Sequence, residues 1–123
     1  MPIRVLIVDD SRSYLDAACA LLEREGLEVV GVASTSAAAL QQARALEPDV
    51  VLVDISLGEE SGFELARRLV ENDPDDQAAL VLISTRAEAD FEDLIAESPA
   101  VGFLAKADLS ADALRAILDG RSR

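Results

Sequence analysis

The feature that most constrains the fold of this chain is a regular alternation of short apolar runs with longer stretches of helical periodicity. The runs are rich in Val, Ile and Leu and have the length of buried strands, and they cover residues 3–8, 27–33, 50–53, 80–83 and 101–105. Strand and helix alternate five times, with no long linker and no internal repeat. This order favours right-handed βαβ crossovers and a parallel sheet covered by helices on both faces.

Helices are expected between and after these runs. They cover residues 11–25, from 34 or 36 to 46, 62–70, 89–97 and from 110 onward, with a loop over 55–61 and a turn over 72–76. A serine hydroxyl can accept a free N–H group of a first helical turn. The expected caps are therefore Ser11, either Ser34 or Ser36, and Ser110.

Length and charge limit the classes of function that this chain can have. Its 123 residues suit a single domain over residues 1–123 with enough length for one well-buried core. The formal net charge of −13 disfavours nucleic acid and anionic membranes as partners, because their phosphates would be repelled. This negative charge is compatible with divalent cations and basic protein surfaces as partners.

The sequence lacks histidine, and it lacks segments typical of membrane spans or signal peptides. It has no histidine, which removes histidine-based catalysis and histidine-ligated zinc. No run is long enough to span a membrane, and the first residues do not have the form of a signal peptide. We therefore expect a cytoplasmic protein. The single cysteine, Cys19, lies on an apolar helical face and is expected to be an inert core thiol.

Charged and hydroxyl groups stand where four of the runs end: Asp9 and Asp10, Asp54, Ser84 with Thr85, and Lys106. Open parallel sheets bind ligands beyond the carboxyl ends of their strands. Three ionised carboxylates in one cleft repel one another, and a divalent cation reverses that penalty. Oxygen ligands without histidine or cysteine favour Mg²⁺ or Mn²⁺. The plainer interpretation of the aspartate pair, as helix caps or turn residues, stays open at this point.

The ammonium and one hydroxyl can complete the chemistry of such a cluster. Lys106 can pair with a carboxylate and then with an incoming phosphoryl oxygen. For the hydroxyl, Ser84 and Thr85 are both candidates. We favour Ser84, because a phosphoryl group enters more easily where the following residue is small, and Thr85 is followed by the bulky Arg86.

In this order and at these spacings, the motifs resemble the receiver domain of two-component response regulators, the CheY-like family, over essentially the whole chain. The matching segments are Val8-Asp9-Asp10, residues 52–63 around Asp54, Ser84-Thr85, and Gly102-Phe103-Leu104-Ala105-Lys106. The resemblance implies an α/β fold of the (βα)5 flavodoxin-like type. This is a three-layer sandwich whose five-stranded parallel sheet has the order 2-1-3-4-5.

The resemblance also implies roles for individual residues. Asp54 would be the phosphoacceptor, and Ser84 and Lys106 would bind the phosphoryl oxygens. The residues that would hold Mg²⁺ are Asp10, Asp54 and the Ser56 backbone carbonyl directly, and Asp9 mainly through water. The residues expected to tune the lifetime of the acyl phosphate are Ser56, Thr85 and Arg86.

A conformational switch is the second implication of the resemblance. Ser84 would move toward the phosphoryl group, and Phe103 would rotate into the vacated space. These movements would change the surface formed by the fourth helix, fifth strand and fifth helix. A plain half-buried aromatic is the other interpretation of Phe103. The chain departs from the family at Gly58 and Ala107, where proline is frequent. We expect a more flexible loop at Gly58 and no cis peptide bond before Ala107.

The function implied is a signalling switch that accepts a phosphoryl group from a histidine kinase or histidine phosphotransfer protein, with a downstream protein target or output domain. It would catalyse only its own phosphorylation and dephosphorylation, and is not expected to be an enzyme that acts on a released substrate. Two alternatives remain open. One is a small Mg²⁺-dependent aspartyl phosphatase, and the other is a receiver-like module that binds proteins without being phosphorylated.

Overall fold

Five parallel strands form the sheet that the alternating pattern predicts. The computed structural model describes residues 2–72, 78–86 and 88–121. The strands are β1 (Arg4–Val8), β2 (Glu28–Ala33), β3 (Val50–Asp54), β6 (Ala79–Ser84) and β7 (Gly102–Ala105). Their order in the sheet is β2-β1-β3-β6-β7, and every neighbouring pair is parallel. Counted along the chain as strands one to five, this is the predicted order 2-1-3-4-5.

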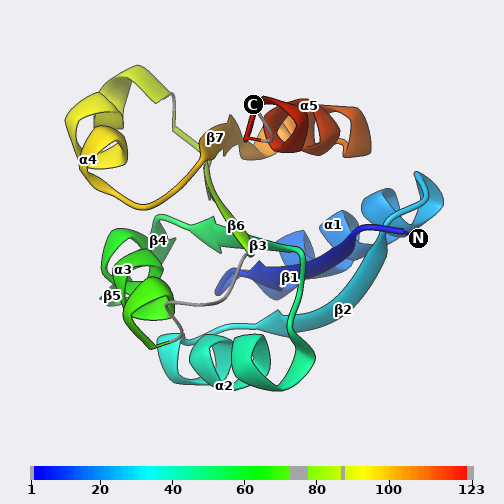
Figure 1. Cartoon of the computed structure of the whole chain (residues 1–123), viewed down its shortest axis with the longest axis horizontal. Coiled ribbons are helices and arrows are strands. Elements are labelled where there is room, and N and C mark those ends of the chain that lie inside the picture. Colours follow the sequence, from blue (N-terminus) through cyan, green and yellow to red (C-terminus); the bar gives the residue numbers. More distant parts are fainter. Residues whose placement is uncertain (1, 73–77, 87, 122–123) are drawn as a thin grey trace.

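Helices cover both faces of this sheet, which confirms the three-layer sandwich (Figure 1). The helices are α1 (Arg12–Arg24), α2 (Ser36–Leu46), α3 (Gly62–Asn72), α4 (Glu92–Glu97) and α5 (Ala111–Arg121). Alternate side chains of each strand point to opposite faces. Val5 and Ile7 of β1 therefore pack with α1 and α5, whereas Leu6 and Val8 pack on the side of α2 and α3. None of the helices within the described residues is long and apolar enough to cross a membrane.

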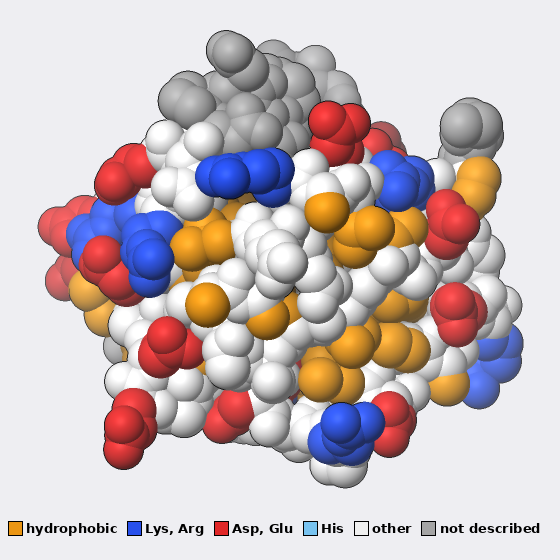
Figure 2. All heavy atoms as spheres, turned by 90° about the horizontal axis from the view of Figure 1, so that it is seen from below, with side chains coloured by type: hydrophobic (Ala, Val, Ile, Leu, Met, Phe, Trp, Pro, Cys, Tyr) orange, Lys and Arg blue, Asp and Glu red, His pale blue; other side chains and the backbone are white. Residues whose placement is uncertain are grey.

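The start of α2 differs from the prediction, because its cap is neither Ser34 nor Ser36. The Thr35 side chain accepts the Ala38 N–H at 3.2 Å, and Ser36 is the first helical residue. Small residues such as Ala39 and Ala43 face the sheet and let the helix lie close to it. Figure 2, which views the molecule from the side of α2, shows hydrophobic side chains interspersed with acidic and basic ones.

The helix predicted over residues 89–97 is shorter than expected. Residues Glu88–Phe91 form a 3₁₀ turn, and α4 covers only Glu92–Glu97. Phe91 stands at the cap position and supplies no side-chain hydrogen bond, so the 3₁₀ turn begins the helix in place of a cap. In the turn predicted over 72–76, Asn72 is instead the last residue of α3, and residues 73–76 lie outside the described residues.

The loop after β3, which we expected Gly58 to make more flexible, contains regular structure. It contains a small antiparallel hairpin of β4 (Ser56–Leu57) and β5 (Glu60–Ser61), with Gly58 in the left-handed region at φ +62°. Leu57 is buried, and the Glu60 carboxylate accepts the Ser36 N–H at 3.0 Å. These contacts fix the loop against the start of α2. As expected at Ala107, the described residues contain no cis peptide bond.

Candidate functional site

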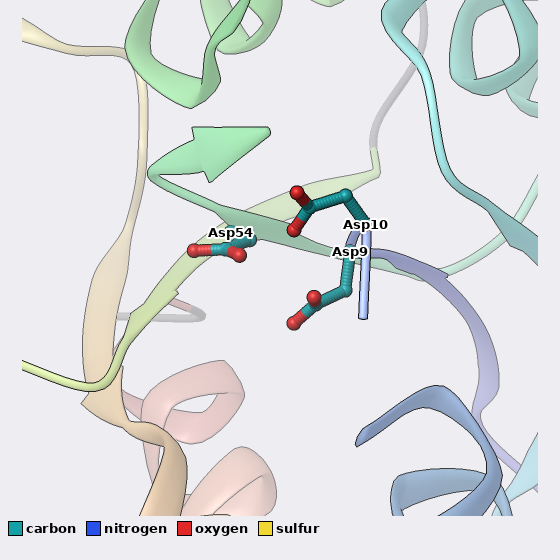
Figure 3. Close-up of side chains that lie close together, drawn as sticks. All are labelled: Asp9, Asp10 and Asp54. Atoms are coloured by element: carbon teal, nitrogen blue, oxygen red, sulfur yellow. The ribbon is translucent and has the colours of Figure 1, made fainter. Parts of the chain in front are cut away.

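Three carboxylates meet at the carboxyl edge of the sheet. Asp9 and Asp10 follow β1, and Asp54 ends the neighbouring strand β3 (Figure 3). The two strands are in register there, with Val8 opposite Val53, so their ends lie side by side. One carboxylate oxygen from each aspartate lies within 4.8 Å of the others. The convergence predicted from the sequence is therefore present for all three residues.

Asp9 is the most enclosed of the three, with no exposed surface. Its N–H donates to the Ala33 carbonyl at 3.0 Å, and its Oδ1 accepts the Ser11 N–H at 2.8 Å. Asp54 is 5% exposed, whereas Asp10 is exposed at the mouth of the site. Asp9 and Asp54 are thus held by the backbone of the core, and Asp10 is reachable from solvent.

Lys106 contacts two of these carboxylates from the end of β7. Its Nζ lies 2.6 Å from Asp9 Oδ2 and 3.2 Å from Asp54 Oδ2, and its side chain is only 12% exposed. Burial alone would lower the pKa of Lys106. The hydrogen bond with Asp9 and the negative charges of Asp54 and Asp9 outweigh it, so the pKa is raised above its ordinary value. The side chain therefore stays a cation at neutral pH.

The pKa of the Asp54 carboxyl is raised above its usual value. Burial is the largest cause, and the charge of Asp9 acts in the same direction. The hydrogen bond from the Ser56 N–H to Oδ1, at 3.1 Å, and the Lys106 ammonium oppose the rise. Burial and the charge of Asp9 prevail, so Asp54 carries its negative charge at a cost that an added cation would reduce.

The hydroxyl candidates occupy different environments. Ser84 ends β6 opposite Ala105 of β7 and is 3% exposed, whereas Thr85 is exposed. Ser84 Oγ accepts the Arg86 N–H at 2.9 Å. The Arg86 side chain turns toward the 3₁₀ turn that precedes α4, where its Nε lies 3.6 Å from Asp90 Oδ2 and its Cζ lies 5.1 Å from the centre of the Phe91 ring. Ser84 is therefore the hydroxyl enclosed at the end of the strand.

Two further predicted residues, Ser56 and Phe103, lie on different elements. Ser56 begins the hairpin after Asp54 and is exposed, with only its N–H bonded to the Asp54 carboxylate. Phe103 lies in β7 opposite Leu82 and is half-buried against the core on the side of α3 and α4. This position is compatible with both interpretations of Phe103, as a residue that rotates in the switch and as a half-buried aromatic without such a role.

Tyr14 also belongs to the site, although it was not among the candidates predicted from the sequence. Its ring centre lies 4.6 Å from Lys106 Nζ. Burial, together with the charges of Asp9 and Asp54, raises its pKa to about 12, so the phenol is neutral. The available signal was position, because Tyr14 stands four residues after Asp10, in the first turn of the helix that follows the aspartate pair.

The donor set fits a hard divalent cation. Three ionised carboxylates and one ammonium give −3 + 1 = −2, which a divalent cation neutralises. All three ligand groups are carboxylates, the type that Mg²⁺ and Mn²⁺ prefer. Asp9, Asp10 and Asp54 are the residues that would hold it.

Comparison with known proteins agrees with the geometry. The family model of the response regulator receiver domain matches residues 5–119. The response regulator GacA of Pseudomonas viridiflava is 34% identical over 116 residues, which are 94% of this chain and 53% of that protein. The chain thus spans about half the length of the curated relatives it matches.

Solved structures show the same fold. The signal receiver domain of the putative response regulator NarL from Mycobacterium tuberculosis superposes with a TM-score of 0.79 at 29% identity, covering 97% of this chain and 95% of that one. A response regulator from Burkholderia pseudomallei, solved with a phosphorylated aspartic acid, a calcium ion and citrate, has a TM-score of 0.79 at 26% identity. That match covers 94% of this chain and 66% of the other. This chain belongs to the receiver domain family of the response regulators of two-component signalling.

Proposed function

We propose that this receiver accepts a phosphoryl group on Asp54 from a histidine kinase or histidine phosphotransfer protein, with Mg²⁺ held by Asp9, Asp10, Asp54 and the Ser56 backbone carbonyl. The observation that carries the proposal is the Lys106 ammonium, which lies 3.2 Å from Asp54 and 2.6 Å from Asp9 on a side chain that is only 12% exposed. A positive charge fixed beside a carboxylate is what transfer of a phosphoryl group to that carboxylate requires. We expect such a switch to act in the cytoplasm.

The chemistry follows from the residues around Asp54. A carboxylate oxygen of Asp54 forms the new bond to phosphorus as the bond from phosphorus to the donor breaks, and the donor leaves with that electron pair. Lys106 attracts the phosphoryl oxygens as negative charge spreads over them. Bound Mg²⁺ would supply further neutralisation of the same charge. Ser84 is proposed to bind a phosphoryl oxygen through its hydroxyl.

The route of the signal is proposed to run through Ser84 and Phe103. The Ser84 hydroxyl accepts the Arg86 N–H, so any movement of Ser84 toward a phosphoryl oxygen pulls on the backbone that leads to α4. Phe103 lies in β7, next to β6, and can follow. The surface of α4, β7 and α5 would then contact a downstream target or output domain. Thr85, Arg86 and Ser56 are proposed to tune the lifetime of the phosphorylated state.

The test is incubation with acetyl phosphate and Mg²⁺, followed by intact-mass measurement. We expect one phosphoryl adduct on the wild type. The adduct should be absent when EDTA is added, and it should be absent from the variants Asp54→Asn and Asp10→Asn. Asp119→Asn changes an exposed aspartate of α5 in the same way and should keep the adduct. No adduct on the wild type would favour a module that only binds proteins, and sustained turnover of a small phosphate ester would favour a phosphatase.

A further inference from the structure

The Lys106 ammonium is held on three sides, and carboxylates account for only two of them. Asp9 and Asp54 contact it at 2.6 and 3.2 Å, and the Tyr14 ring lies on the third side with its centre 4.6 Å from Nζ. A cation at this distance from an aromatic face is attracted by the negative centre of the ring. The attraction is stronger here than at an open surface, because the Lys106 side chain is only 12% exposed.

Tyr14 is fixed by the same turn that fixes Asp9. Ser11 donates its N–H to Asp9 Oδ1 at 2.8 Å, and Ser11 Oγ accepts the Tyr14 N–H at 3.3 Å. The Tyr14 hydroxyl donates to the Lys106 carbonyl at 3.4 Å, so the residue contacts both ends of Lys106. The junction between β1 and α1 therefore places the Asp9 carboxylate and the Tyr14 ring on the same ammonium.

We propose that Tyr14 is a positioning residue whose ring holds the Lys106 ammonium against Asp54 for phosphoryl transfer. This inference rests on the function proposed above. A lysine side chain has a flexible four-carbon stem, and a charge fixed in advance avoids the loss of freedom that ordering it would cost during the reaction. An apolar residue in place of Tyr14 would fill the space but would not attract the ammonium.

The first test separates the ring from simple packing. The initial rate of adduct formation from acetyl phosphate and Mg²⁺ is measured by intact mass for the wild type, Tyr14→Phe and Tyr14→Leu. We expect Tyr14→Phe to stay within about twofold of the wild type, since it keeps the ring face. Tyr14→Leu should be about 3- to 30-fold slower, the range that loss of a partly buried cation–π contact gives.

Two control variants accompany the comparison of Tyr14→Phe with Tyr14→Leu. Tyr14→Met offers a second, unbranched replacement without a ring, in case Tyr14→Leu fails to fold. Phe63→Leu makes the same ring-to-leucine change on the opposite face of the sheet, where Phe63 packs against Phe91 at 6.2 Å between ring centres. It should leave the rate within about twofold of the wild type. Equal slowing in Phe63→Leu would mean that general loosening of the fold explains the result.

A double-mutant cycle tests whether Tyr14 acts through Lys106. In a Lys106→Ala background, adding Tyr14→Leu should change the residual rate by less than about twofold, because the ring has no ammonium left to hold. The same slowing in both backgrounds would show a structural role and overturn the proposal. Tyr14→Phe as slow as Tyr14→Leu would also overturn it, because the hydroxyl rather than the ring would then matter.

The outcomes distinguish this inference from the function on which it rests. If the wild type forms no adduct, the proposed phosphorylation is wrong, and the proposed role of Tyr14 is wrong as well. If the wild type is labelled and Tyr14→Leu is labelled equally fast, only the role of Tyr14 is wrong.

Discussion

Helices α3 and α4 cover the same face of the sheet but are attached to it by different forces. α3 buries Gly62, Leu65, Ala66 and Leu69, and it begins where the Gly62 N–H donates to the Ile55 carbonyl at 2.9 Å, next to Asp54. None of the six residues of α4, all of which the structure describes, is buried, and Leu94 is 49% exposed. The helix beside the acceptor strand is thus held by buried core packing, whereas α4, which follows Ser84 along the chain, is attached only through partly buried and exposed side chains.

The difference in burial between α3 and α4 shows which part of the fold can move at a low cost in free energy. Free energies of local opening are smallest where few apolar side chains are buried. We expect a change at Asp54 to leave α3 in place, because moving α3 would expose its buried leucines. The same change transmitted by Ser84 reaches a helix whose start is held by Arg86 through Asp90 and Phe91. This contrast supports α4 as the mobile element of the proposed switch.

The largest expected effect is on stability. Leu65→Ala in α3 removes a fully buried side chain and should lower the free energy of unfolding by about 2–5 kcal/mol. Leu94→Ala makes the matched change in α4 and should stay within about 0.5 kcal/mol of the wild type. Urea denaturation measures both. Similar losses of unfolding free energy in the two variants would show that α3 and α4 are not held differently.

Hydrogen exchange should show the same contrast without any substitution. We expect the amides of residues 95–97 in α4 to exchange at least about 100-fold faster than those of residues 66–69 in α3, after correction for intrinsic rates. The physical reason is that α4 can open without exposing buried core. Mass spectrometry of peptides from the two helices provides the measurement. Equal protection would show that α4 is held as firmly as α3.

Gly62→Ala tests how tightly α3 is joined to the acceptor strand. A Cβ at this position would overlap the Asp54 carbonyl oxygen and lie 2.7 Å from Ile55 Cα, so backbone must shift. We expect a loss of about 1–3 kcal/mol in the free energy of unfolding. Gly120→Ala in α5 is the control, because nothing lies within 4 Å of its Cβ, and it should gain about 0.5–1 kcal/mol. A neutral Gly62→Ala would contradict the close fit.

Arg86→Ala should have the smallest effect on stability and a clear one on α4. The Arg86 side chain is 66% exposed, so losing its contacts with Asp90 and Phe91 should cost less than about 1 kcal/mol. Exchange of the α4 amides should nevertheless accelerate, while that of α3 stays unchanged. Arg67→Ala removes an exposed ion pair within α3 and serves as the control. If α4 exchange does not respond, Arg86 does not hold the helix.

The sequence predicted the parallel sheet and the position of the acidic cluster for a common reason, whereas the strand order 2-1-3-4-5 was implied by the resemblance to the receiver family. Strand-length apolar runs, helical stretches and capping residues are local patterns, and the βαβ connection constrains how they assemble. Asp9, Asp10, Asp54 and Lys106 could be found because each directly follows or ends such a run. Thr35 was missed as a cap because three neighbouring hydroxyl residues all satisfy the same local rule. The hairpin after β3 was missed because each of its strands has only two residues.

Taken alone, the sequence determined the architecture and which charged groups gather at one edge, since both follow from patterns within a few residues of one another. Only the tertiary structure decided how firmly each element is held. The Tyr14–Lys106 contact joins residues 92 positions apart, and the Glu60–Ser36 hydrogen bond joins residues 24 apart. Such contacts depend on strand register and on the rotation of each helix about its axis. These quantities arise from the packing of the whole core, which no local pattern records.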